Sequence, residues 1–95
     1  MDEFKARQLA QIRFGITDFR DGRISLNALL SRLEGAARAV GQEFWEQKVF
    51  DTVWDLEQIN VDVVEERRVL TPSEKMQVES LLAQLERRLG QVDCS

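Results

Sequence analysis

The chain has 95 residues, 43% hydrophobic and 32% charged, which is enough for one domain with a modest core and too apolar for a disordered chain. Its net charge of −4 argues against a nucleic-acid-binding protein. One proline and five glycines are too few for the turns of an all-β fold. It has no histidine, no glycine-rich phosphate loop and one cysteine, Cys94. We therefore expect no catalytic residues, no cofactor, no metal site and no disulfide framework.

The start of the sequence is charged and lacks the apolar run of a signal peptide. No segment approaches the ~18 uninterrupted apolar residues of a membrane span. With a single cysteine, a reducing compartment is the default. We expect a cytoplasmic protein.

The first two helices are predicted from apolar residues at steps of three and four. The first stripe contains Leu9, Ile12, Ile16 and Phe19, and it is interrupted at Asp21-Gly22. Ser25 is a candidate N-cap, because its hydroxyl can accept a hydrogen bond from a free amide. The second stripe contains Leu26, Leu29, Leu30, Leu33, Ala37 and Val40. Gly41 is expected to end this helix.

A third helix, the longest, is predicted over roughly Gln42 to Arg67. The segment 71–74 then indicates a helix start, with Thr71 as N-cap, Pro72 in the first position and Glu74 closing a capping box. The fourth helix carries Val78, Leu81, Leu82, Leu85 and Leu89, and is expected to stop at Gly90. Four amphipathic helices with short connections predict an all-α fold: one domain over 1–95, an antiparallel bundle of about four helices.

The third helix carries almost all of the excess negative charge. Residues 43–66 hold eight acidic residues and a single lysine, a net charge of −7. At about 100° per residue, five of these acids fall on one narrow arc of the helix. This acidic stripe consists of Asp51, Asp55, Asp62, Glu65 and Glu66. Like charges four residues apart destabilise a helix by ~0.2–0.5 kcal/mol per pair, so folding alone does not require the stripe.

Two apolar faces flank the acidic stripe. The Trp45 face contains Trp45, Val49, Leu56, Ile59 and Val63, and the Trp54 face contains Phe50, Trp54, Val61 and Val64. Aromatic residues at helical spacing usually lie in a core, so the Trp54 face is expected to be buried. The Trp45 face either packs on a neighbouring helix or, with Trp45 as anchor, forms a partner surface with the stripe. The predicted partner-binding residues are Trp45, Asp51, Asp55, Asp62, Glu65 and Glu66; the alternative for the acids is a solvated face.

Two polar residues fall near the expected core. Glu57 lies in the middle of the Trp54 face. A buried carboxylate is unfavourable without a partner, so we expect an ion pair with an arginine of the first two helices. The candidates are Arg13, Arg20 and Arg32, and the alternative is an exposed groove in which Glu57 meets a ligand. Asn60 is expected to form a hydrogen bond between helices.

Three segments carry a resemblance to a known class of protein. They are 18–35 (DFRDGRISLNALLSRLEG), 54–59 (WDLEQI) and 68–74 (RVLTPSE). Over roughly residues 12–89 the chain resembles the small helical immunity proteins of bacterial contact-dependent growth inhibition and polymorphic toxin systems. The resemblance implies a cytoplasmic, non-enzymatic protein that binds a secreted toxin domain and blocks its active site or its access to substrate. It transfers no catalytic residues.

The sequence thus favours an immunity protein, or antitoxin, that neutralises a cognate toxin domain through an acidic helical face. A nuclease toxin would present a basic groove to phosphate, and an acidic helix can occupy that groove as a substrate mimic. The expected partner is a toxin domain with a basic surface, with no direct nucleic acid and no membrane. The alternatives are a small adaptor or a homodimer formed through the Trp45 face, and a regulatory cofactor of transcription.

Overall fold

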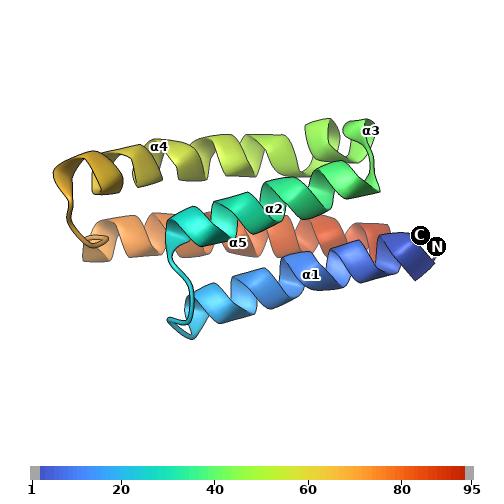
Figure 1. Cartoon of the computed structure of the whole chain (residues 1–95), viewed down its shortest axis with the longest axis horizontal. Helices are drawn as coiled ribbons and strands as arrows, with labels where there is room; N and C mark the ends of the chain where they lie inside the picture. The colour runs from blue at the N-terminus through green and yellow to red at the C-terminus, as the bar shows by residue number, and fades with distance from the viewer. Residues whose placement is uncertain (1–2, 94–95) are drawn as a thin grey trace.

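The computed structural model describes residues 3–93, with side chains from residues 3–90, so Cys94 lies outside the described residues. Its regular structure is helical: α1 (Glu3–Arg20), α2 (Leu26–Val40), α3 (Gln42–Phe44), the π-helical turn η1 (Trp45–Val49), α4 (Phe50–Glu66) and α5 (Pro72–Asp93). In Figure 1 the segment α3–η1–α4 forms one of the antiparallel helical segments of an up-down bundle. The predicted all-α bundle of about four helices is confirmed.

The helices are arranged so that α1 and α4 occupy opposite corners of the bundle. The helix α2 packs against both α1 and α4, and α5 packs against both from the other side. The molecule measures 41 × 23 × 18 Å. None of the described helices combines the length and the apolar composition needed to cross a lipid bilayer.

The predicted apolar stripes of α1, α2 and α5 meet in one core. Its largest fully buried members are Leu9, Ile12, Ile16, Leu29, Leu33, Val49, Leu56, Val78, Leu82, Leu85 and Leu89. Phe19, Ile24, Phe44, Ile59, Leu70 and Leu81 pack against it at its margin. Because each stripe recurs at steps of three and four, a single face of each helix supplies these contacts.

The predicted helix starts are confirmed. The Ser25 hydroxyl accepts a hydrogen bond from the Ala28 amide at 3.2 Å. At the start of α5 the Glu74 amide donates to Thr71 Oγ1 at 3.1 Å, and the Thr71 amide donates to Glu74 Oε1 at 2.9 Å. This reciprocal pair is the predicted capping box. Gly41 ends α2 with φ of 155°, a backbone conformation that side chains disfavour.

The third helix covers the predicted range but is not α-helical throughout. It is interrupted by η1, where the Phe50 amide donates to the carbonyl of Trp45, five residues earlier. The wider turn changes the rotation per residue there, which a calculation at about 100° cannot anticipate. The helix ends at Glu66, because Arg67 adopts a left-handed conformation with φ of 52°. The Arg67 and Arg68 amides donate to the carbonyls of Val64 and Val63, as in a Schellman motif.

The expected stop at Gly90 is wrong, since α5 continues to Asp93. Glycine permits a left-handed turn but does not impose one. Leu89, directly before it, is fully buried, so core packing holds this end of α5 in helical conformation.

Candidate protein-binding face of α4

The Trp45 face is the side of the third helix that packs into the core. Trp45 is 5% exposed and Val49 and Leu56 are fully buried. The Arg38 guanidinium covers the Trp45 ring at 5.0 Å from its centroid. The expectation that Trp45 is an accessible anchor for a partner is therefore wrong, and so is a homodimer built on this face.

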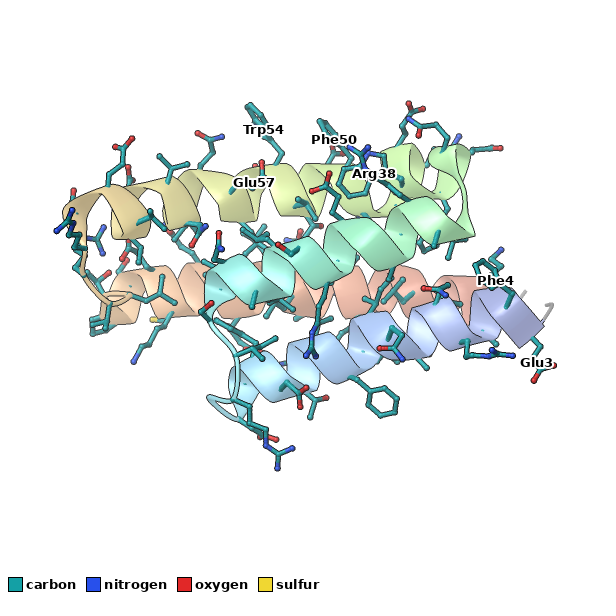
Figure 2. All side chains as sticks on the ribbon, in the orientation of Figure 1. Glu3, Phe4, Arg38, Phe50, Trp54 and Glu57 are labelled. Atoms are coloured by element: carbon teal, nitrogen blue, oxygen red, sulfur yellow. The ribbon has the colours of Figure 1, made fainter. Side chains whose placement is uncertain are left out.

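The Trp54 face is the exposed side, so the expectation that it is core is also wrong. Figure 2 shows Phe50 and Trp54 pointing away from the bundle. Phe50 is 43% exposed, Trp54 53%, Val61 47% and Val64 57%. These four large apolar side chains, all about half exposed, form an apolar strip along one face of α4, and exposed apolar surface of this kind can mark a protein interaction site.

Three aromatic rings, those of Trp45, Phe50 and Trp54, are in successive contact from the core to the surface. Trp45 meets Phe50 edge to face, with ring centroids 5.7 Å apart and an interplanar angle of 80°. Phe50 is in turn stacked with Trp54, with centroids 6.4 Å apart and an angle of 24°. Both geometries are favourable for aromatic pairs. The buried Trp45 therefore supports the position of the exposed Phe50 and Trp54.

The acidic stripe lies beside this apolar strip, and all five of its residues are exposed. Glu66 forms an ion pair with Arg68. Within the described part of the chain, the other four acids, Asp51, Asp55, Asp62 and Glu65, have no ion-pairing partner. Their charges are thus uncompensated locally and project a negative field next to the apolar strip.

Arg68 links the end of α4 to the start of α5. Its guanidinium donates to both carboxylate oxygens of Glu74, at 2.6 and 2.9 Å, as well as to Glu66. These bonds, together with that from the Thr71 amide, lower the pKa of Glu74 from 4.5 to about 2. The same bonds raise the pKa of Arg68 above its usual range. Glu66 is therefore the one member of the acidic stripe that also has a structural role.

Glu57 is half-buried in the middle of the Trp54 face, and the expected ion pair is wrong. Arg20 instead donates to Glu86 at 2.7 and 3.0 Å and to Glu79 at 3.1 Å, while Arg32 donates to Asp18 at 3.1 Å. Arg13 and Arg20 lie on α1, at the opposite corner of the bundle from α4. Among the described residues, no hydrogen bond or ion pair reaches the Glu57 carboxylate.

Asn60 forms the expected hydrogen bond between helices, since its Nδ2 donates to Asn27 Oδ1 of α2 at 3.0 Å. Beside this pair, a groove of about 980 Å³ opens where the α1–α2 and α4–α5 connections meet. Its apolar lining includes Ile24, Val63 and Leu70, and Val64 also lines it. Because Val64 belongs to both, the groove extends the apolar strip to the end of the bundle.

The site residues that reasoning from sequence missed are those of the Trp54 face. The signal that could have found them is Glu57, because a charged residue in the middle of an apolar arc indicates a face that meets water. No group of three or more cysteine or acidic side chains in the described part of the chain is arranged to hold a metal ion. The features of α4 that can act on another molecule are therefore its apolar strip and its carboxylates.

Comparisons with protein-family models, with curated proteins and with solved structures each gave no match.

Proposed function

We propose that this chain is a cytoplasmic, non-enzymatic immunity protein that binds and neutralises a bacterial toxin domain through the outer face of α4. The observation that carries the proposal is the exposure of Phe50, Trp54, Val61 and Val64 directly beside the acidic stripe. The resemblance of segments 18–35, 54–59 and 68–74 to immunity proteins supplies the class of partner.

The two halves of this surface have different physical roles in binding. Exposed aromatic side chains are the common anchors of protein interfaces, because they bury a large area with few rotatable bonds. Carboxylates at the rim contribute mainly to the association rate and to the choice of partner. In this proposal Trp54 and Phe50 supply affinity, while Asp51, Asp55, Asp62 and Glu65 steer a basic protein toward them.

The charge of the surface restricts the partner to a basic protein surface. Phosphate groups of nucleic acids and of anionic membranes would be repelled by four unpaired carboxylates. A nuclease domain must present cations to its substrate, so the acidic stripe could occupy its groove in place of phosphate. We propose a cognate toxin domain with such a basic groove.

The alternative of a homodimerising module or adaptor is less well supported. The Trp45 face, through which the sequence would allow a homodimer, is in the core. Self-association through the outer face of α4 would instead bring two acidic stripes to one interface, where like charges repel.

The experiment is surface-immobilised binding kinetics against the toxic C-terminal domain of a large secreted protein encoded by the adjacent upstream reading frame. The association rate should fall as ionic strength rises, and Asp51→Lys with Asp55→Lys should lower it further. Trp54→Ala should mainly raise the dissociation rate.

The matched control is Glu3→Lys with Asp21→Lys, which makes the same change in charge at exposed positions of α1 and of the α1–α2 connection. It should bind nearly as the parent does. A salt-independent association rate, with both double variants binding like the parent, would leave the stripe as a solvated face and favour the adaptor.

A further inference from the structure

We propose that Glu57 is the specificity residue of the α4 surface and receives an arginine guanidinium of the partner in the centre of the Trp54 face. This inference rests on the proposed function and adds the chemical group that the partner must supply. It assigns to Glu57 a role different from that of the acidic stripe, because Glu57 would act in the contact itself rather than at its rim.

The first argument is the environment of the carboxylate. Glu57 lies three residues after Trp54 and four before Val61, so both are its neighbours on the helix surface. It is half-buried, and no described residue donates a hydrogen bond or an ion pair to it. Any protein that covers the exposed Trp54 and Val61 also removes water from this carboxylate. Such desolvation opposes binding unless the partner supplies a cation.

The second argument is that the guanidinium group fits both neighbours at once. It is planar, it donates to carboxylates through two parallel N–H groups, and it lies favourably on an aromatic face. The spacing of Trp54 and Glu57 places an indole and a carboxylate one helical turn apart. A partner arginine could therefore hydrogen bond to Glu57 while it lies against Trp54.

The third argument is that the chain already uses this arrangement internally. Arg38 lies 5.0 Å from the centroid of the Trp45 ring, and its Nη2 is 3.0 Å from Glu34 Oε1. One guanidinium is thus shared between an indole and a carboxylate in the same part of the bundle, next to Phe50 in Figure 2. Arg38 is already engaged in this way, so Glu57 is left for a partner.

The first test compares Glu57→Gln with Glu65→Gln in binding to the toxin domain of the adjacent reading frame. Each removes one charge from an exposed face of α4, so the two should reduce the association rate similarly. Only Glu57→Gln should raise the dissociation rate, by about tenfold or more, because it removes a charge pair inside the contact. Equal dissociation rates for the two variants would overturn the assignment.

The second test needs no protein partner. Two-dimensional NMR of the isotope-labelled chain is recorded during titration with N-acetyl-arginine amide and, in parallel, with the neutral isostere N-acetyl-citrulline amide. The arginine compound should shift the Trp54 indole and the amides around Glu57. These shifts should be absent with citrulline and in Glu57→Gln, and kept in Glu65→Gln. Equal shifts with both compounds, or shifts that Glu57→Gln leaves in place, would overturn the proposal.

The two tests separate this inference from the proposed function. If the parent chain does not bind the toxin domain, the proposed function fails, and the titration alone decides whether Glu57 is a guanidinium site. If the parent binds and Glu57→Gln binds equally well, the proposed function stands and the role of Glu57 is rejected.

Discussion

At the scale of single residues, the two tryptophans have opposite environments. Trp45 is 5% exposed and held between the core and Arg38, whereas Trp54 is 53% exposed. Removing a buried aromatic side chain leaves a cavity, while removing an exposed one leaves few contacts unsatisfied. A substitution of Trp45 is therefore expected to affect stability, and a substitution of Trp54 to affect binding.

We predict that Trp45→Ala lowers the free energy of unfolding by about 3–5 kcal/mol. Trp54→Ala should change it by less than about 0.5 kcal/mol, since its ring is half in solvent. Urea unfolding followed by circular dichroism measures both. A loss of several kcal/mol in Trp54→Ala would show that the outer face of α4 is packed, and would remove the surface on which the proposed function stands.

At the scale of elements, two local features form the connection between α4 and α5: a left-handed residue and a group of ion pairs. Arg67 takes the left-handed position of the Schellman motif, which a residue with a Cβ occupies at a disadvantage of roughly 1–2 kcal/mol. Arg68 then joins Glu66 to Glu74, and Glu74 closes the capping box of α5. The left-handed Arg67 is a strained backbone conformation, so it should respond to substitution by glycine. The Arg68–Glu74 pair depends on charge, so it should respond to pH.

Arg67→Gly is expected to raise the free energy of unfolding by about 0.5–1 kcal/mol. The gain from relieved strain is partly offset by the greater freedom of glycine in the unfolded chain. The matched control is Arg87→Gly, the same substitution at an exposed position inside α5. This variant should have a free energy of unfolding lower by about 1 kcal/mol. Chemical denaturation measures the free energy of unfolding of both variants. A lower free energy of unfolding in Arg67→Gly as well as in Arg87→Gly would contradict the left-handed conformation of Arg67.

The low pKa of Glu74 predicts a pH-dependent contribution to stability. Because folding lowers this pKa from 4.5 to about 2, the charged carboxylate stabilises the folded chain above about pH 4.5. That contribution is lost as pH falls toward about 2. Glu74→Gln keeps an oxygen that can accept from the Thr71 amide, but it loses the charge that faces Arg68.

The melting temperature of Glu74→Gln should therefore lie below that of the parent at neutral pH. The difference should shrink between about pH 4.5 and about pH 2, and nearly vanish at the lower limit. Thermal scans of parent and variant at each pH measure it, with Glu65→Gln as a control for removing an exposed carboxylate. A difference that stays constant through this range would mean that Arg68 does not hold Glu74 in solution.

At the scale of the whole molecule, the charge distribution governs association between copies. The chain has a net charge of −4, and the unpaired acids lie beside the apolar strip of α4. Pairing two copies through that strip brings like charges together, which disfavours association most strongly at low salt.

We predict that the protein is a monomer at micromolar concentration in low salt. Sedimentation velocity at several ionic strengths measures the oligomeric state, and Trp54→Ala tests whether any dimer uses the outer face of α4. A stable dimer at low salt that Trp54→Ala dissociates would support the homodimerising module instead of the toxin-binding protein.

Local signals in the sequence determined the elements of this fold. The helix starts at Ser25 and Thr71 and the spacing of Leu9, Ile12 and Ile16 depend on residues within about four positions of one another. These interactions form in the same way wherever the helix lies in the bundle, which is why the all-α architecture could be predicted. The charge of the acidic stripe is likewise a property of α4 alone.

Only the tertiary structure decided which side of α4 is buried and which is exposed. Helical periodicity fixes the angles between Leu56, Trp54 and Asp51 around the axis of α4, but it does not fix the rotation of that axis against its neighbours. That rotation follows from packing on α2 and α5, which buries Leu56 and exposes Trp54. The same packing sets α1 at the opposite corner, where Arg20 pairs with Glu79 and Glu86 of α5 and is out of reach of Glu57.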